Sequence, residues 1–163
     1  MPELTVRKAK QTDAALIQAL IKELAEAEQF PHAVSVTEAD LKKNLFGENP
    51  AAEVLLFYQN DKPAGFAVFY QTFATTTRRR GLHLDDLYIR PEFQGQGMGK
   101  KALGVLASIA KELGCGRFEW WALKWNQRAI DLYENIGARK MKELRIFRLQ
   151  EEDIERVSAE WGT

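Results

Sequence analysis

Apolar and polar residues follow two periods along this chain, one typical of helices and one typical of strands. Helical spacing begins after Thr12 and Asp13, either of which can cap a helix, and Pro31 is predicted to end that helix. A second helix is predicted to begin within residues 37–40. The apolar inner faces comprise Leu16, Ile17, Leu20, Ile21 and Leu24 in the first helix and Leu41 and Leu45 in the second.

Shorter apolar runs without helical spacing predict strands. Two of these runs, 53–59 and 65–72, flank the sequence Asn-Asp-Lys-Pro at 60–63, which predicts a β-hairpin. The polar and basic segment 75–81 is expected to be a loop. The predicted strands are 4–7, 53–59, 65–72, 82–89, 118–123 and 144–149.

The later helices complete an order in which strands and helices alternate. Helices are predicted at 101–113 and 127–136, with Gly137 ending the second, and the acidic tail from Glu151 is expected to be helical. A hairpin followed by this alternation predicts an α/β fold with a mixed central sheet and helices on both faces. We find no internal repeat or linker, so a single domain over residues 1–163 is predicted.

The composition is that of a globular protein with balanced charge. Apolar residues make up 45% of the 163 residues, and 23 basic side chains match 23 acidic ones. This balance argues against nucleic acid or a membrane as a partner, and no apolar run is long enough to span a bilayer. With a single cysteine and no apolar leader, the expected location is the reducing cytoplasm.

The cysteine and histidine residues do not form a metal-binding pattern. Cys115 lies between two glycines and is expected to be a packing residue rather than a nucleophile. His32 and His83 are isolated, so no metal is predicted. A proton-relay role for His83, which directly precedes Leu84 and Asp85, is the less favoured alternative.

The segment 94–100, Gln-Gly-Gln-Gly-Met-Gly-Lys, indicates a ligand site between a predicted strand and a predicted helix. Its glycines let the backbone approach a ligand closely, and the N–H groups at a helix N-terminus bind phosphate. The spacing fits neither a dinucleotide fingerprint nor a P-loop. A turn that only reverses the chain is the alternative interpretation.

Two motifs occur in one order along the chain. The first is Gln-x-x-Gly-x-Gly, which Gln94, Gly97 and Gly99 fill; the second, Trp-Asn-x-x-Ala-Ile-x-x-Tyr-x-x-x-Gly-Ala, spans 125–138. Together they resemble the acetyl-CoA site of the GNAT superfamily of N-acetyltransferases. The segments 20–25, 37–41, 46–48 and 84–89 further resemble the diamine (spermidine/spermine) and thialysine N-acetyltransferase family.

The resemblance implies acetyl-CoA as the cofactor. Residues 95–100 would bind its pyrophosphate. The backbone at 87–89 would pair with its pantetheine amides like an added strand. The alternative is that residues 87 and 89 are core residues only. Asn126 would contact the cofactor, cap the following helix, or do both. The expected cofactor-binding residues are Leu87, Tyr88, Ile89, Gln94, Gly95, Gln96, Gly97, Met98, Gly99, Lys100, Asn126, Ala129 and Tyr133.

The resemblance also implies that a neutral amine attacks the thioester directly. Tyr133 would be the acid, since a phenol is protonated at neutral pH, although a tyrosine packed on the sheet is the alternative. Asp85 stands where the family has a glutamate proposed as the base, and its shorter side chain favours a water relay. A structural carboxylate is the alternative. Because side chains alternate along a strand, only one of Asp85 and Asp86 is expected to face the cleft.

The acceptor is expected to be a small primary amine that also carries an acid group. Three arginines at 78–80 would repel a polycation and bind a carboxylate, unless they form a solvated loop tip. We therefore favour a lysine-like or thialysine-like amino acid over spermine. The expected substrate-binding residues are Glu28 and Asp85 for the amine, Arg80 for the carboxylate and Trp121 as a wall of the acceptor tunnel.

Two further functions remain open on the same scaffold. One is a non-catalytic acyl-CoA-binding sensor, which the presence of Tyr133 and Asp85 disfavours. The other is a protein lysine or N-terminal acetyltransferase, although the substrate-side loop resembles the small-molecule branch. The resemblance also implies a homodimer with acceptor sites near the subunit interface.

Overall fold

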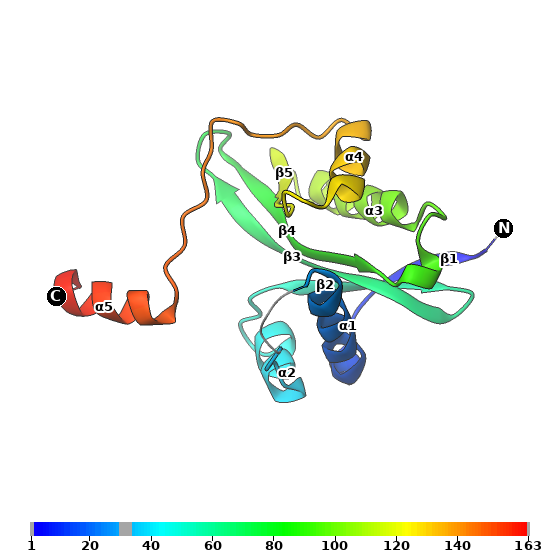
Figure 1. Ribbon diagram of the computed structural model, residues 1–163, viewed down its shortest axis with the longest axis horizontal. Helices are drawn as coiled ribbons and strands as arrows, with labels where there is room; N and C mark the ends of the chain where they lie inside the picture. Colours follow the sequence, from blue (N-terminus) through cyan, green and yellow to red (C-terminus); the bar gives the residue numbers. More distant parts are fainter. Residues whose placement is uncertain (1, 30–33, 163) are drawn as a thin grey trace. The chain divides into compact units, whose positions relative to one another are not determined.

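The computed structural model describes residues 2–29 and 34–162, which form two compact units. The first unit extends to Leu123 and the second begins at Lys124. Pro31, the predicted end of the first helix, and His32 lie outside the described residues. The first unit contains β1 (Leu4–Lys8), η1 (Gln11–Asp13), α1 (Ala14–Ala27), α2 (Glu38–Phe46), β2 (Glu53–Gln59), β3 (Lys62–Ala74), β4 (Arg79–Ile89), η2 (Pro91–Phe93), α3 (Met98–Glu112) and β5 (Arg117–Trp120) (Figure 1).

The first unit is built on a mixed sheet of five strands in the order β1-β2-β3-β4-β5. Neighbours from β1 to β4 are antiparallel, whereas β4 and β5 are parallel and joined through α3. The predicted hairpin between β2 and β3 is confirmed, with Asn60 and Asp61 at φ of 48° and 63° in its turn. The mixed sheet predicted from the sequence is therefore present.

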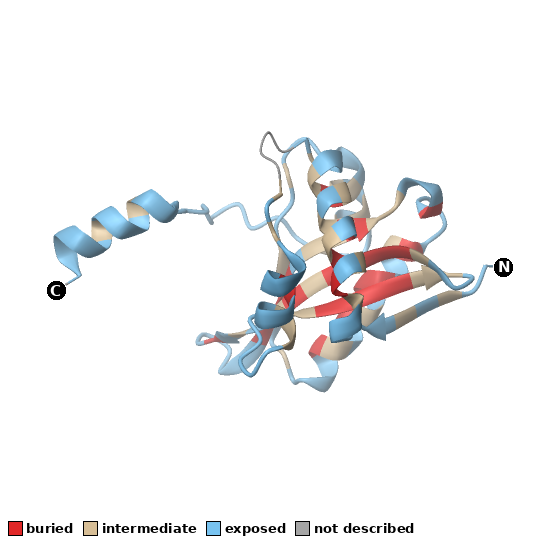
Figure 2. Cartoon of the chain, turned by 90° about the horizontal axis from the view of Figure 1, so that it is seen from below, coloured by how far each residue is buried: buried red, intermediate tan, exposed pale blue. Residues whose placement is uncertain are grey.

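Helices cover both faces of this sheet, with α1 and α2 on one face and α3 on the other (Figure 1). The core is concentrated along the central strands (Figure 2). Two successive residues of β2, Val54 and Leu55, are both buried although they point to opposite faces, as expected for a sheet covered on both sides. The core under α1 and α2 consists of Ala14, Ile17, Leu20, Leu24, Leu41, Val54, Leu56, Phe66 and Tyr88.

Helix boundaries follow the predicted capping residues. Asp13 is the N-cap of α1, and Thr37 caps α2 by accepting a hydrogen bond from the Asp40 N–H at 3.1 Å. The Asp40 carboxylate in turn accepts the Thr37 N–H at 2.8 Å, which completes a capping box.

Several predicted boundaries are wrong. β4 begins at Arg79, so only residues 75–78 of the expected loop are outside a strand. β5 ends at Trp120, three residues before the predicted end at 123, and α3 begins at Met98 rather than at 101. The predicted strand 144–149 has no regular structure, because no described strand pairs with it.

The second unit contains α4 (Gln127–Asn135) and α5 (Glu151–Trp161). The Asn126 side chain accepts the Ala129 N–H at 3.3 Å, which confirms its capping role, and Gly137 at φ 96° follows the end of α4. The helical tail from Glu151 is also confirmed. Over the described ranges, no helix has both the length and the apolar character needed to cross a membrane.

Candidate active site

The two halves of β4 have different neighbours. β5 pairs with β4 from Gly81 to Leu84, where Trp120 is the last partner. β4 continues to Ile89, so its second half keeps its pairing to β3 but has no β5 strand beside its other edge. The predicted pantetheine-binding backbone at 87–89 lies in this second half. An open strand edge of this kind can accept an extended amide chain as an additional strand.

The glycine loop follows this open edge and leads into α3. Gly95 and Gly97 have φ of 75° and 85°, a region that favours glycine, and Gly97 is the N-cap of α3. The first bond within the helix joins the Lys101 N–H to the Gly97 carbonyl at 3.0 Å, so the preceding N–H groups have no partner within the helix. A Cβ on Gly97 would meet no atom within 4 Å, so there is room for a ligand beside this turn.

The end of β4 is held to α1 by an ion pair that sequence analysis missed. Arg90 donates from Nε and Nη2 to the two carboxylate oxygens of Glu23, at 2.9 and 2.8 Å, and from Nη1 to the Pro63 carbonyl at 3.0 Å. This two-pronged geometry fixes the guanidinium more strongly than a single contact would. Because these partners are distant in sequence, no local pattern indicates the pair. It fixes the chain just before the glycine loop.

A β-bulge interrupts β4 at Asp85. Val68 of β3 pairs with Asp86 and the next residue, Phe69, pairs with Leu84, so Asp85 is an extra residue without a partner in the ladder. The expectation that Asp85 and Asp86 alternate regularly is therefore wrong. Asp85 is exposed and Asp86 is half-buried. A bulge redirects side chains, and this one directly follows Leu84, the last residue of β4 that pairs with β5.

Two neighbouring carboxylates act on Asp86 beside this bulge. Burial raises the pKa of Asp86 to about 7, and the negative charges of Asp85 and Glu28 add to the effect. Burial also raises the pKa of Glu28, at the C-terminal end of α1. The structure thus brings together Glu28 and Asp85, both predicted as amine-binding residues, around Asp86. Asp86 itself was not predicted as a site residue, and its position next to Asp85 in the sequence was the signal that could have indicated it.

Three aromatic rings lie next to the carboxylates. Tyr70 and His83 are cross-strand partners with ring centroids 5.0 Å apart, and Trp121 meets His83 edge-to-face at 5.1 Å. His83 is buried, and the pKa of Tyr70 is raised by burial and by the charge of Asp85. Trp121, predicted as a wall of the acceptor site, therefore lies in this cluster even though it follows the end of β5.

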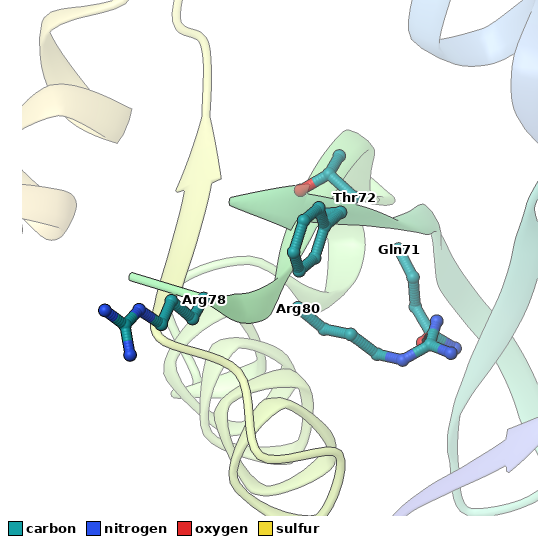
Figure 3. Close-up of a pocket in the computed structure, with 5 residues that line it drawn as sticks. Gln71, Thr72, Arg78 and Arg80 are labelled. Atoms are coloured by element: carbon teal, nitrogen blue, oxygen red, sulfur yellow. Dashed lines mark hydrogen bonds between the residues drawn. The ribbon is translucent and has the colours of Figure 1, made fainter. Parts of the chain in front are cut away.

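Arg80 lies on the other face of the sheet. It pairs with Phe73 of β3, and its Nη1 donates to Gln71 Oε1 at 2.9 Å. Residues 71 and 73 point away from the face of Tyr70, because side chains alternate along β3. Arg80 extends towards Gln71 and Arg78 points away from it (Figure 3). The expectation that Arg80 shares a cleft with the carboxylates is thus corrected. These side chains line a cavity of about 530 Å³, formed by Gln71, Thr72, Phe73, Arg78 and Arg80.

The remaining predicted residues belong to the second unit. Ala129 and Tyr133 are one helical turn apart in α4, and both are half-buried. The Asn126 side chain is engaged in capping α4, as described above. No trio of His, Cys, Asp or Glu among the described residues is placed to hold a metal ion.

The sheet, its open edge and the glycine loop define the acyl-CoA N-acyltransferase class. The sequence matches the acetyltransferase (GNAT) family over residues 17–138. A thialysine N-epsilon-acetyltransferase from Sus scrofa is 36% identical over 151 residues, which cover 88% of each chain. A spermidine/spermine N(1)-acetyltransferase-like protein 1 from Homo sapiens is 36% identical over 145 residues, covering 85% of this chain and 21% of that protein. An integron cassette protein structure from V. cholerae has the same fold, with a TM-score of 0.80 and 24% identity over 95% of this chain and 97% of its own.

The chain therefore belongs to the GNAT acetyltransferase family. It is an enzyme that acetylates amines, and the acyl donor in this family is acetyl-CoA. Membership sets aside the alternative of a non-catalytic acyl-CoA-binding sensor.

Proposed function

We propose that the enzyme acetylates the terminal primary amine of a small molecule, with a lysine-like or thialysine-like amino acid as the favoured acceptor. The observation that carries the proposal is the open half of β4, with the glycine loop at its end and three carboxylates at its start. This arrangement offers binding groups for an amide chain, a phosphate and an ammonium in sequence along one strand.

The residues of the first unit fit acetyl-CoA. The backbone of Leu87 and Ile89 would pair with the pantetheine amides, and the N–H groups from Gly95 to Lys100 would bind the pyrophosphate at the N-terminus of α3. Gln94 donates from Nε2 to the Ile89 carbonyl at 2.8 Å, which ties the loop to the strand edge. When bound, the cofactor supplies the thioester that is attacked.

In the proposed reaction the neutral amine nitrogen attacks the thioester carbonyl. As the bond between carbon and sulfur breaks, Tyr133 donates its hydroxyl proton to sulfur, and a proton from the acylated nitrogen restores the phenol. The net products are the amide and the CoA thiol. The match of Tyr133 to the family motif supports this role.

Polyamines are the second candidate acceptor class. The carboxylate cluster around Asp86 would favour a polycation as well as a single ammonium, and one relative is named as spermidine/spermine acetyltransferase-like. The relative named for thialysine, which matches 88% of its length, supports the amino-acid acceptor. A protein lysine or N-terminus is the third alternative.

CoA thiol release tests the function with acetyl-CoA and a panel of spermidine, spermine, putrescine, lysine, thialysine, an amino sugar and a histone-like peptide. We expect the highest kcat/KM with thialysine or lysine. A clear preference for spermine over every amino-acid amine would assign the second class instead, and activity only on the peptide would assign the third.

Tyr133→Phe tests the proposed acid. We expect kcat to fall at least 100-fold, on the order expected for a lost proton donor, with acetyl-CoA affinity unchanged by calorimetry. Tyr58→Phe is the matched control, since Tyr58 lies in β2 and its hydroxyl accepts from Nη2 of Arg7 in β1 at 2.8 Å. Full activity of Tyr133→Phe would remove Tyr133 from the mechanism.

The family resemblance also supports a homodimer. Exposed apolar side chains in the second unit, among them Ile146 and Phe147, would suit a subunit interface. Light scattering after size exclusion tests this, and a monomeric mass at micromolar concentration would contradict it.

A further inference from the structure

We propose that Asp86, rather than its neighbour Asp85, takes the proton from the acceptor ammonium, while Asp85 and Glu28 hold that ammonium by their charges. This inference rests on the proposed function and names the residue that converts the bound ammonium into a nucleophile. It also assigns different tasks to two adjacent carboxylates.

The bulge in β4 provides the geometric basis. Asp86 is paired across the sheet with Val68, which packs against the core under α1, so Asp86 stays in the regular ladder on the α1 face. Asp85 has no ladder partner and is exposed. The inner carboxylate is therefore fixed by the sheet, and the outer one is free to meet an incoming cation.

The groups around Asp86 are those that a proton acceptor needs. Glu28 approaches from the end of α1 and Asp85 from the same strand, and both charges are negative. From β3, Val68 is apolar, and the pKa of the Tyr70 phenol is raised by burial and by the charge of Asp85. Arg90, the first basic residue after Asp86 in the sequence, is engaged with Glu23. Asp86 is thus partly buried and lies near two negative charges, and both conditions favour its protonated form.

This environment reduces the difference in pKa between the acceptor ammonium and the carboxylate that takes its proton. An alkyl ammonium with a pKa of about 10 transfers its proton to an ordinary aspartate with an equilibrium constant of roughly one in a million. The pKa of Asp86 is about 7, so the same transfer is unfavourable by only roughly a thousandfold. Asp85, by contrast, is exposed at the bulge.

The proton balance follows directly. The ammonium N–H bond breaks and its proton goes to a carboxylate oxygen of Asp86, directly or through one water, leaving a neutral amine. The nitrogen lone pair then forms the new bond to the acetyl carbon. Asp86 releases its proton to solvent before the next turnover, which accounts for the one proton produced per ammonium acetylated.

The test is the pH profile of kcat/KM for the acetylation of thialysine, or of whichever panel amine the wild type acetylates. Wild type should lose activity below a pKa near 7. Asp86→Asn should lower kcat/KM at pH 7.5 by about 100-fold or more and abolish that acid limb. Asp85→Asn should raise KM for the amine and move the limb to lower pH, because a charge that raises the pKa of Asp86 is removed.

Controls separate catalysis from folding. Asp61→Asn, in the β2–β3 turn, is the matched carboxylate-to-amide change and should leave the profile unchanged. Circular dichroism and acetyl-CoA affinity check that Asp86→Asn is folded. If it does not fold, the limb shift in Asp85→Asn still tests the proposal, since Asp86 is intact there. Carbon-13 labelling of aspartate carboxyls supplies a readout independent of turnover, with one resonance titrating near pH 7.

The outcomes are distinct. The proposal would be overturned if the acid limb of the kcat/KM profile were lost in Asp85→Asn and retained in Asp86→Asn, because the base would then be Asp85. An aspartate spectrum with no carboxyl titrating near neutrality would overturn it as well. If wild type acetylates no amine at all, the proposed function fails first, and the role of Asp86 fails with it.

Discussion

The two halves of β4 share one strand but not one environment. In the first half, from Arg79 to Leu84, β3 and β5 lie on either side, and Leu82, His83 and Leu84 are buried. In the second half, Asp85 to Ile89, β3 remains and β5 is absent. The first half is built for stability, whereas the second carries an open edge and the half-buried Asp86. The candidate site therefore begins where β5 stops pairing with β4.

The bulge marks the boundary between the halves. Without the extra residue at Asp85, Asp86 would fall out of its pairing with Val68, and every later side chain of β4 would change face. Tyr88, which packs into the core under α1, depends on this register. The same irregularity therefore keeps the open half attached to its core and sets the two carboxylates apart.

The largest expected effect comes from disturbing the backbone contact that holds the open half to β3. Gly65 lies opposite Ile89, and a Cβ there would overlap the Tyr88 carbonyl oxygen. Gly65→Ala should lower the free energy of unfolding by about 3 kcal/mol or more, because backbone must move to relieve the overlap. Urea unfolding measures this loss, which should be accompanied by weaker acetyl-CoA binding.

Gly104→Ala in α3 is the matched control for this change. A Cβ on Gly104 meets nothing within 4 Å, so the variant should gain about 0.5–1 kcal/mol from helix propensity. Equal stability of the two variants would mean that β4 can shift away from β3 at no cost. The second half of β4 would then not be held in place by its contact with β3.

An effect of the opposite sign is expected from the carboxylate of the open half. The pKa of Asp86 is about 7 in the folded protein and about 3.9 in an unfolded chain. Between these values the unfolded chain has released the proton and the folded one still binds it, so stability falls as pH rises through this window. Asp86→Asn should be more stable than wild type by about 2–4 kcal/mol at pH 8.5 and equal to it near pH 4.

Chemical denaturation at a series of pH values measures this difference. The same substitution is expected to lower kcat/KM by about 100-fold or more, so stability and function would oppose each other at one residue, as is common at active sites. A variant that is less stable than wild type at pH 8.5 would mean that the ionised carboxylate is well solvated, and the contrast between the two halves would be lost.

The sequence predicts the local features of this site better than its long-range ones. The glycine turn at Gly95 and Gly97 and a helix start within 37–40 were predicted from short-range chemistry, and capping by Asn126 was one of the two roles left open for it. The end of β5 at Trp120 was not, because the run stays apolar from Trp120 to Leu123 and only pairing determines where the strand stops. Likewise, the apolar pattern at 144–149 predicts a strand, but a strand also requires a partner.

The carboxylates show the same limit. Glu28 and Asp85 were predicted from a family resemblance, but the approach of Glu28 to Asp86 depends on how α1 packs on the sheet. Alternation along a strand predicts opposite faces for Asp85 and Asp86, and the bulge that breaks it has no signature in the sequence itself. Register depends on two paired strands, so it cannot be predicted from the sequence of β4 alone.

The smallest expected effect tests the first half of β4. Arg80 donates to Gln71 on the face away from Tyr70, so Arg80→Gln should change kcat/KM for thialysine by less than about twofold, and stability by about 0.5 kcal/mol or less, as for an exposed polar substitution. Asp85→Asn, five residues further along the strand, supplies the contrasting change in KM. A tenfold rise in KM for thialysine in Arg80→Gln, with putrescine unaffected, would show that the arginine binds the acceptor carboxylate. The first half of β4 would then contribute to specificity, and the division between a structural and a functional half would have to be abandoned.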